Sequence, residues 1–331
     1  MNLLGQILRK SNRQSDKLSI LTGATHETFE TALSLTGHNF YCLYNPIWKV
    51  WNETFRKCPP NYILLKDGEI PIELDIDVII SQQKVGQHQY LYPLSRQYNI
   101  PLIQIEHTAP APWYTKKEMR QIKEMRGDRN IFITDWSRDS WGWNENDGIT
   151  IRHGIDSNIF KPDTNIEKKP YILTVCNQFS KKVREWCCGF KLWEQIIQPN
   201  TKESLPWKHV CDDKGFSLPA KNLQELIKEY QSAQIFLNTS LLSPVPMVLL
   251  ESASVGCAIV STKNCETPNI FTHGENALLS NDPLELRGFC IELLKNKLLR
   301  ERLGAAARQL IIEKFPIDKF VNSWNQVLRS V

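Results

Sequence analysis

Short apolar runs rich in β-branched residues alternate along the chain with longer segments whose apolar positions follow the period of a helix. In the first half, the runs predict strands at Leu18–Leu21, Phe40–Leu43, Asp77–Ile80, Leu102–Ile105, Ile131–Thr134 and Ile149–Arg152. Helical spacing between them predicts helices at Thr28–Leu35 and Gln89–Tyr98. Strands that alternate with helices are typical of βαβ units, in which the strands form a parallel sheet.

The same alternation starts again after Pro162–Pro170, a polar segment bounded by prolines that predicts a linker. The strands expected there are Tyr171–Val175, His209–Cys211, Ile235–Asn238 and Ala258–Ser261. The expected helices are Arg184–Ile197, Leu223–Ser232, Met247–Ser254, one long helix over Pro283–Lys314 and a last helix over Ile317–Arg329. The last helix carries apolar residues at helical spacing, so we expect it to bury one face.

The length of 331 residues is too great for one ordinary α/β core and sufficient for two. We therefore predict an α/β protein with two doubly wound, Rossmann-like domains, residues 1–160 and residues 161–315, followed by a C-terminal helix in residues 316–331. In such a protein the ligand cleft is expected between the domains, at the carboxyl ends of both sheets.

The composition narrows the class of protein further. Hydrophobic residues make up 41% and charged residues 23%, as in ordinary globular proteins, and the formal net charge of +4 permits an anionic partner without requiring one. No apolar run approaches the roughly 18 residues of a membrane span, and the residues after Met1 lack the apolar stretch of a secretory signal. The nine cysteines include no C-x-x-C pair, which indicates reduced thiols in a cytoplasmic protein.

The segment Ser240–Thr262 carries the strongest chemical signal. A strand ends near Asn238, a loop with two prolines follows, and a helix opens at Met247. The free N–H groups of Met247 and Val248, together with the helix dipole, predict a site for an anion such as a diphosphate. One turn into the helix, the carboxylate of Glu251 can accept hydrogen bonds from a ribose diol.

This segment resembles the retaining glycosyltransferases of the GT-B fold, the group 1 or family 4-like enzymes. Their hallmark is a glutamate, seven further residues and a second glutamate, which holds the ribose and is matched here by Glu251. Ser243 stands at the first glutamate, which contacts the sugar, and Pro246 falls in the place of the family's Gly-Phe-Gly. Because proline donates no N–H, the grip on the phosphates is expected to rest on Met247 and Val248.

A second stretch, Ile151–Pro162, is similar to the family's Pro-Asn-Gly-Val-Asp motif, which joins the two domains. Gly154 and Asp156 match the motif, and His153 stands in the place of its asparagine. The resemblance implies the GT-B fold, with two Rossmann-like domains, an interdomain cleft and a last helix that crosses back to pack on the N-terminal, acceptor domain. It also places Gly154 among the residues expected near the donor.

The resemblance assigns candidates for catalysis as well. Lys182 and Arg184 follow the first strand of the second domain, where the family has an arginine and a lysine that stabilise the departing nucleoside diphosphate. His107 ends a strand of the first domain, where many family members have a histidine that contacts the donor sugar. Glu27 opens the first helix, in the loop that corresponds to the family's loop beside the reaction centre.

The implied reaction passes a sugar from a nucleoside-diphosphate sugar, the co-substrate, to a hydroxyl group with retention of configuration and no bound cofactor. We expect no bound metal ion either. The triplet Asp75-Ile76-Asp77 has the letters of a metal-binding motif, but it precedes an apolar strand and is interpreted as a cap of that strand.

The sequence does not identify the acceptor of the sugar. Lys116–Arg129 predicts a basic amphipathic helix. Aromatic residues accompany it at Trp48, Trp51, Trp113, Tyr114, Trp136, Trp141 and Trp143. Basic charge interleaved with aromatic rings suits DNA with an extruded base, an anionic membrane surface or a sugar chain, while a solvated surface helix is the simpler interpretation.

We therefore expect a cytoplasmic hexosyl- or pentosyl-transferase whose acceptor is a saccharide or a lipid-linked glycan, with peripheral membrane contact. The alternative acceptor is DNA with hydroxymethylated bases, because the compact chain looks like phage-encoded family members. A non-catalytic nucleotide-binding module is a further alternative, suggested by Ser243 and Pro246. A sugar-nucleotide epimerase could share the two-domain plan, but its motifs differ from those found here.

Overall fold

The computed structural model describes residues 17–65, 69–71, 73–198 and 203–331, so the N-terminal stretch interpreted above as lacking a secretory signal lies outside the described residues. The chain forms two compact units. Met1–Arg152 and Phe320–Val331 make up the first, and His153–Lys319 makes up the second. The division falls before His153 rather than after residue 160, because Ile155 and Phe160 pack into the core of the second unit.

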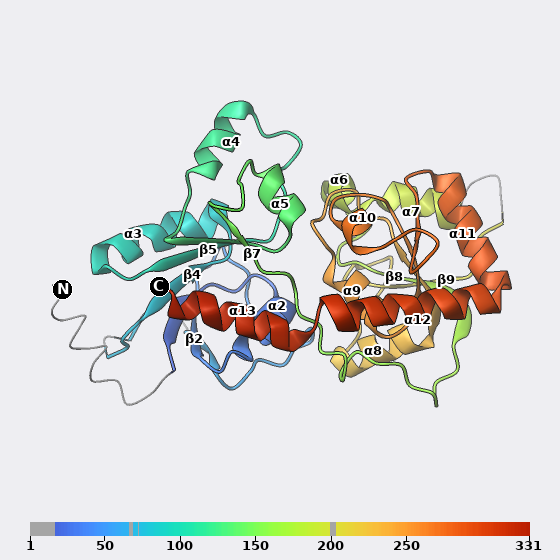
Figure 1. Ribbon diagram of the computed structural model, residues 1–331, viewed down its shortest axis with the longest axis horizontal. Coiled ribbons are helices and arrows are strands. Elements are labelled where there is room, and N and C mark those ends of the chain that lie inside the picture. Colours follow the sequence, from blue (N-terminus) through green and yellow to red (C-terminus); the bar gives the residue numbers. More distant parts are fainter. Residues whose placement is uncertain (1–16, 66–68, 72, 199–202) are drawn as a thin grey trace. The chain divides into compact units, whose positions relative to one another are not determined.

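Seven parallel strands, among the described residues, form the sheet of the first unit in the order β3-β2-β1-β4-β5-β6-β7 (Figure 1). They are β1 Ser19–Thr22, β2 Asn39–Leu43, β3 Tyr62–Leu65, β4 Val78–Ser81, β5 Leu102–Glu106, β6 Arg129–Phe132 and β7 Ile149–Thr150. β1 and β4 are neighbours although β2 and β3 separate them in sequence, so the strand order reverses there. In doubly wound sheets, ligands bind at the carboxyl ends of the two strands that flank such a switch point.

The last helix of the chain completes the core of the first unit. Helix α13 (Ile317–Arg329) runs beside α2 (Glu27–Ser34), as Figure 1 shows. The rings of Phe320 and Trp324 meet the ring of Phe29 edge-on, at centroid distances of 5.7 and 6.1 Å, and all three side chains are buried. The other helical segments of this unit are η2 (Lys84–His88), α3 (Gln89–Tyr98), α4 (Lys116–Lys123) and α5 (Asp135–Ser140).

The described part of the second unit has a five-stranded parallel sheet in the order β12-β11-β10-β8-β9. The strands are β8 Lys169–Val175, β9 Trp207–Val210, β10 Ala233–Asn238, β11 Ala258–Ser261 and β12 Leu278–Leu279. The switch point of this sheet lies between β8 and β10, which are neighbours although β9 separates them in sequence. The segments that follow β8 and β10 therefore form the expected ligand side.

Helices cover both faces of the second sheet, because successive strand residues point to opposite sides. Leu173 and Phe236 pack in one core cluster with α8, α9 and α12, whereas Ile172 and Ile235 pack in another with α7 and α11. The helices of this unit are α6 Glu185–Cys188, α7 Phe190–Ile197, α8 Leu223–Ser232, α9 Met247–Ser254, α10 Thr267–Ile270, α11 Pro283–Lys295 and α12 Lys297–Lys314, with a 3-10 turn η3 at Lys182–Arg184. Across the described chain, no helix combines the length and the apolar character needed to cross a membrane.

Two glycines permit close backbone contacts in the second unit. Gly189 joins α6 to α7 with φ of +72°, and a Cβ atom there would lie 2.2 Å from the carbonyl oxygen of Thr239. At Gly304 in α12, a Cβ atom would lie 2.6 Å from the carbonyl oxygen of Gly256. Helix α12 therefore contacts the turn between α9 and β11 directly through its backbone.

Several predicted helices differ from the structure. The long helix predicted over Pro283–Lys314 is two helices, because Asn296 leaves the helical conformation and its side chain accepts the N–H of Leu299 at 3.1 Å to cap α12. The helix predicted over Arg184–Ile197 is broken at Gly189, whose left-handed backbone ends α6.

The basic helix predicted over Lys116–Arg129 is also too long, since α4 ends at Lys123. After it, the N–H of Asp128 donates to the carbonyl of Leu102 at 2.7 Å, which directs the chain into β6 with Arg129 as its first residue. The carboxylate of Asp77 accepts the N–H of Ser19, the first residue of the neighbouring strand β1, at 2.8 Å, so a cap of the strand that follows Asp77 remains a prediction. The bounds of α3, α8, α9 and α13 are those predicted.

A buried histidine is expected to make the second unit sensitive to acid. The ring of His209, only 5% exposed, stacks on Phe179 at a centroid distance of 4.9 Å. Burial lowers the pKa of His209 from 6.5 to about 4, although Asp213 opposes the shift. Below pH 6.5 the unfolded chain therefore binds a proton that the folded chain does not, so the free energy of unfolding falls as the pH falls from 6.5 toward 4.

We expect this group to lower the free energy of unfolding by about 2 kcal/mol between about pH 7 and about pH 5. Denaturant titrations at both pH values measure the change. The matched variant His209→Phe keeps an aromatic ring against Phe179 and should lose that share of the acid sensitivity. An unchanged pH dependence in the variant would contradict the prediction.

Candidate functional site

The loops that follow β8 and β10 are joined at the switch point of the second sheet. The N–H of Leu241 donates to the carbonyl of Cys187 at 2.8 Å, and the hydroxyl of Thr239 donates to the carbonyl of Cys188 at 3.2 Å. Both acceptors lie at the end of α6, the helix that follows the β8 loop. The two loops therefore form one connected surface at the carboxyl ends of the strands.

Three predicted donor-binding residues lie where the β10 loop enters α9. Ser243 is half-buried in the loop, and Met247 and Val248 are the first residues of the helix. Pro246 precedes them in an extended conformation, and none of the described side chains caps the helix start. The first N–H groups of a helix have no acceptor within it, so those of Met247 and Val248 are suited to an anion.

Glu251, the predicted ribose ligand, lies in the middle of α9 and is only 1% exposed. Its Oε2 atom accepts a hydrogen bond from the hydroxyl of Tyr230 in α8 at 2.9 Å. Because Tyr230 is fully buried, this bond links the carboxylate to α8 inside the second unit. The role of Glu251 toward a ribose remains a prediction.

The two predicted cations of the second unit have different surroundings. Lys182 is exposed on the turn η3, whereas its neighbour Lys181 pairs with the buried carboxylate of Asp213 at 3.4 Å. The guanidinium of Arg184 donates to the Sγ atom of Cys188 at 3.2 Å. Lys182 thus extends into solvent near the switch point, while Arg184 is held against α6.

Gly154 belongs to a different part of the second unit, where its first residues meet the end of α12. It is buried, and the next residue, Ile155, donates its N–H to the carbonyl of Phe315 at 2.8 Å and pairs with Pro316. These contacts place Gly154 where the first residues of the second unit are hydrogen-bonded to the segment after α12. A role in donor binding remains a prediction.

In the first unit, a buried network gathers at the switch point around Gln82. The Nε2 atom of Gln82 donates to the carbonyl of Gly23 and to Oε1 of Glu30, both at 3.1 Å, and lies 3.2 Å from Oγ1 of Thr22. Its Oε1 atom faces Nε2 of His107 at 3.2 Å. The network brings the predicted His107, which follows β5, together with the segments after β1 and β4.

This network determines which nitrogen of His107 carries the proton. The carbonyl of Gly23 only accepts hydrogen bonds, so the atom of Gln82 that faces it must be the amide nitrogen. The amide oxygen therefore faces Nε2 of His107, and that nitrogen must donate. The ring of Phe29, edge-on at a centroid distance of 4.5 Å, holds the imidazole from another side.

We expect the ¹⁵N chemical shifts of His107 to show a protonated Nε2 and an unprotonated Nδ1 when the ring is neutral. The variant Gln82→Met has a side chain of similar length without the amide, so the preference for a proton on Nε2 should weaken to that of a free histidine side chain. Thermal unfolding of the variant serves as the control for an intact fold. A neutral His107 that carries its proton mainly on Nδ1 in the native protein would contradict the assignment.

Glu27, the remaining catalytic candidate, is buried and anchors the segment after β2. It forms an ion pair with Lys49, and its Oε1 atom accepts the N–H of Asn52 at 3.0 Å. Glu30, which the sequence did not single out, is more central. It accepts the hydroxyl of Tyr62 at 2.7 Å as well as the amide of Gln82, and burial raises the pKa of Glu30.

Lys84 is another buried charge that the sequence did not indicate. Its Nζ atom lies 4.6 Å from the ring centroid of Trp143 and donates to the carbonyl of Ile122 at 3.3 Å. Burial lowers the pKa of Lys84 to about 8, while the buried carboxylate of Glu106 opposes that shift. The aromatic rings of this region thus pack against a cation of the protein itself.

The aromatic residues considered for acceptor binding are mostly inside the first unit. The indoles of Trp48, Trp51, Trp141 and Trp143 are all less than a tenth exposed, whereas Trp113 is 60% exposed. The apolar side of α4 packs on the cluster that contains Trp141 and Trp143. Of these five indoles, Trp113 is therefore the one placed to stack on an acceptor.

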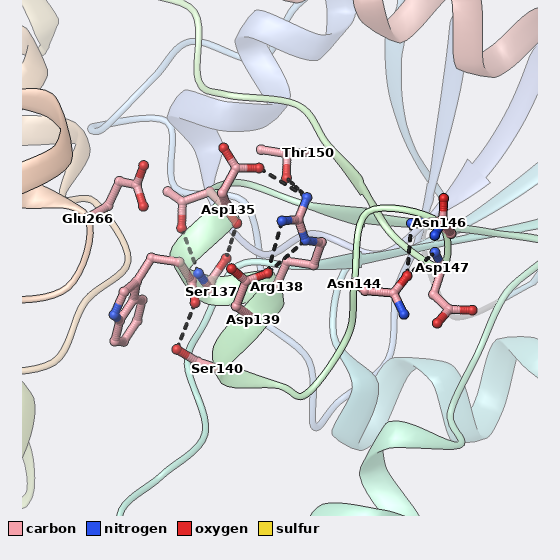
Figure 2. Close-up of polar contacts among 12 residues, drawn as sticks. Asp135, Ser137, Arg138, Asp139, Ser140, Asn144, Asn146, Asp147, Thr150 and Glu266 are labelled. Carbon is pink, nitrogen blue, oxygen red and sulfur yellow. Dashed lines mark hydrogen bonds and ion pairs between the residues drawn. The ribbon is translucent and has the colours of Figure 1, made fainter.

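A polar cluster joins α5 to the edge of the first sheet (Figure 2). The guanidinium of Arg138 reaches the carboxylates of Asp135 at 3.1 Å and Asp139 at 2.9 Å. It also lies 3.5 Å from the hydroxyl of Thr150 in β7. Because these charges satisfy one another, the cluster is understood as a structural link between α5 and the edge strand.

Comparison with known proteins identifies the second unit. Residues 201–310 match the family described as Glycosyl transferases group 1. Most of the second unit is therefore similar to the group 1 glycosyl transferases. The matched part contains Ser243, Met247, Val248 and Glu251, while Lys182 and Arg184 precede it.

One curated relative of the chain is the 2-deoxystreptamine N-acetyl-D-glucosaminyltransferase of Niallia circulans, which is 37% identical over 86 residues. The aligned part makes up 25% of this chain and 22% of that protein. The chain therefore spans only about a fifth of the length of this relative.

Solved structures share the fold over nearly the whole chain. Anabaena HepE in complex with UDP-glucose has a TM-score of 0.71 at 12% identity and covers 95% of this chain and 100% of its own. Sucrose-phosphate synthase from Thermosynechococcus elongatus has a TM-score of 0.70 at 13% identity, covering 95% and 99%. At these identities the likeness concerns the fold, and it confirms the predicted α/β class and GT-B fold.

Proposed function

We propose that the protein transfers a sugar from a nucleoside-diphosphate sugar to a hydroxyl group. The observation that supports the proposal is the switch point between β8 and β10, because the segment after β8 carries the exposed Lys182 and the loop after β10 leads into the start of α9. A helix start and a lysine suit a diphosphate, and the nearby carboxylate of Glu251 suits a ribose diol. The match of residues 201–310 to the group 1 glycosyl transferases supports the same activity.

In the proposed reaction, the bond between the anomeric carbon and the diphosphate oxygen breaks as the acceptor hydroxyl attacks. Negative charge develops on the departing diphosphate, where Lys182 and the N–H groups of Met247 and Val248 stabilise it. Arg184 adds a second positive charge once its contact with Cys188 is exchanged for a phosphate oxygen. The departing phosphate accepts the acceptor's proton, so the proposal needs no protein nucleophile, retains the anomeric configuration and includes no metal ion.

We propose that His107 of the first unit forms a hydrogen bond with the donor sugar. The bond from its Nε2 to Gln82 and the edge-on contact with Phe29 hold the imidazole in one orientation. A ring that is already oriented loses little conformational entropy when a sugar hydroxyl binds to it.

We further propose that the donor is a UDP-hexose. The proposed acceptor is a saccharide or a lipid-linked glycan. The HepE crystal structure contains UDP-glucose, and the Niallia relative is named as an N-acetyl-D-glucosaminyltransferase. The burial of Trp141 and Trp143 removes two of the rings that suggested an acceptor surface, whether for DNA, a membrane or a sugar chain.

The test is to incubate the protein with UDP-, GDP-, ADP- and TDP-hexoses and to measure the free nucleoside diphosphate, with and without EDTA. We expect release from a UDP-hexose that persists in EDTA and increases with a saccharide or glycolipid acceptor. Nuclear magnetic resonance of the product should show the anomeric configuration of the donor. Stimulation by hydroxymethylated DNA alone would assign the acceptor to DNA instead, and nucleotide binding without release from any donor would indicate a non-catalytic module.

A further inference from the structure

The segment that follows β8 is hydrogen-bonded to the segment that follows β9. The N–H of Gln178 donates to the carbonyl of Asp212 at 3.2 Å, and the N–H of Asp212 donates to Oδ1 of Asn177 at 3.2 Å. Gln178 has a φ of +53°, in the left-handed region that residues other than glycine rarely adopt. The contacts with Asp212 therefore stabilise a bend of the β8 segment that is unfavourable by itself.

The side chain of Asp213 contacts the β8 segment twice, immediately before Lys182. Its Oδ2 atom accepts the N–H of Ser180 at 2.6 Å, and its Oδ1 atom lies 3.4 Å from Nζ of Lys181. Two N–H groups of the turn at residues 216–217 donate to the backbone carbonyl of Asp213 at 2.9 and 3.0 Å. Asp213 is only 1% exposed, so a buried carboxylate on a fixed backbone links the two segments.

These contacts distinguish two adjacent lysines at the switch point. Lys181 is paired with Asp213, whereas Lys182 begins the turn η3 and is exposed. The N–H of Arg184 donates to the carbonyl of Lys181 at 2.8 Å, so the backbone around Lys182 is hydrogen-bonded on both sides of the turn. Because a lysine side chain is flexible, the region that its ammonium group can reach depends on how firmly its backbone is fixed.

We propose that Asp213 is a positioning residue, which fixes the β8 segment so that Lys182, and not Lys181, is presented to the diphosphate of the donor. Asp213 acts through Ser180 and Lys181 and need not contact the donor itself. The link to the donor rests on the proposed function. Since a displacement of about 1 Å can lower a rate about 100-fold, the loss of these two contacts is expected to affect catalysis.

The first measurement is amide hydrogen exchange of the full chain, which requires neither donor nor turnover. In Asp213→Ala the amide of Ser180 loses its acceptor, so residues 177–184 should exchange at least about tenfold faster than in the native protein. Asp213→Asn keeps an oxygen that can accept this N–H and should retain most of the protection. The matched control Asp212→Ala removes an exposed carboxylate, keeps its backbone contacts with the β8 segment and should leave the exchange unchanged.

The second measurement is a double-mutant cycle, which separates positioning of Lys182 from a general loss of stability. Calorimetry gives the dissociation constant of UDP, and steady-state assays with a UDP-hexose give kcat, for Asp213→Ala, Lys182→Ala and the double variant. Asp213→Ala alone should weaken UDP binding and lower kcat, each about tenfold, and Asp213→Asn should recover most of both. Added to Lys182→Ala, it should change either quantity less than about twofold, because it acts through that lysine.

A loss on Asp213→Ala that is equally large with and without Lys182 would overturn the inference, because the carboxylate would then act independently of that lysine. Unchanged hydrogen exchange in residues 177–184 would overturn it as well. Circular dichroism verifies the fold of each variant. A protein that binds no nucleotide and transfers no sugar would refute the proposed function, while the exchange measurement would still decide whether Asp213 fixes the β8 segment.

Discussion

Lys182→Ala is expected to lower kcat for sugar transfer about 100-fold, since removing one group that stabilises a developing oxyanion costs about 10²–10³ in kcat. The loss should be larger in kcat than in donor KM, because the charge on the diphosphate oxygen increases in the transition state. Steady-state assays of nucleoside diphosphate release with a UDP-hexose measure both constants. Lys182→Arg keeps the positive charge and should recover part of the rate.

The matched control is Lys191→Ala, which removes an exposed lysine from the neighbouring helix α7. It should keep the wild-type rate, and a similar loss in both variants would indicate a general effect of charge. A Lys182→Ala enzyme with wild-type kcat would exclude Lys182 from the mechanism and assign the leaving-group role to Arg184 alone.

Glu251→Gln is expected to raise the donor KM about 10- to 100-fold. A hydrogen bond to a charged group contributes about 1.5–3 kcal/mol, and about 1.4 kcal/mol corresponds to a factor of ten. The glutamine has the size of the glutamate and retains an oxygen that can accept the bond from Tyr230. The variant therefore mainly removes the negative charge that would accept hydrogen bonds from the ribose. The donor KM and the dissociation constant of UDP measure the effect.

Tyr230→Phe separates the ribose role of Glu251 from its structural role. It removes the hydroxyl that donates to Glu251 at 2.9 Å and leaves the carboxylate in place. The variant should lose about 1 kcal/mol of unfolding free energy and keep a donor KM close to that of the native enzyme. If Glu251→Gln also left KM unchanged while lowering stability, Glu251 would be a structural residue only.

The elements with strong periodicity could be predicted from sequence. Met247–Ser254 begins after two prolines and ends before Gly256, and Ile317–Arg329 carries a continuous apolar stripe, so both helices have the predicted bounds. The division of Pro283–Lys314 into two helices depends on one side-chain cap at Asn296, whereas the apolar pattern continues through it. Periodicity predicts which face is buried, but a single cap decides where a helix ends.

The candidate site was predictable where the chain itself brings residues together, as at Met247, Val248 and Glu251 along one helix. Glu30 could not be identified in this way. Its partners Tyr62 and Gln82 are far away in sequence, and only the folded sheet makes a buried acceptor of this carboxylate. Lys84 is a similar case, since its low exposure depends on rings that follow much later in the chain.

The close contact at Gly189 has a mechanical consequence. It lets the β10 loop come close enough for Leu241 and Thr239 to donate hydrogen bonds to the carbonyls of Cys187 and Cys188, which couple the loop to the α6–α7 joint. A nucleotide that displaces one of these segments must therefore move the other with it. Amide hydrogen exchange in the two segments should slow together on donor binding, and donors of different length would be accommodated by a collective shift of both segments.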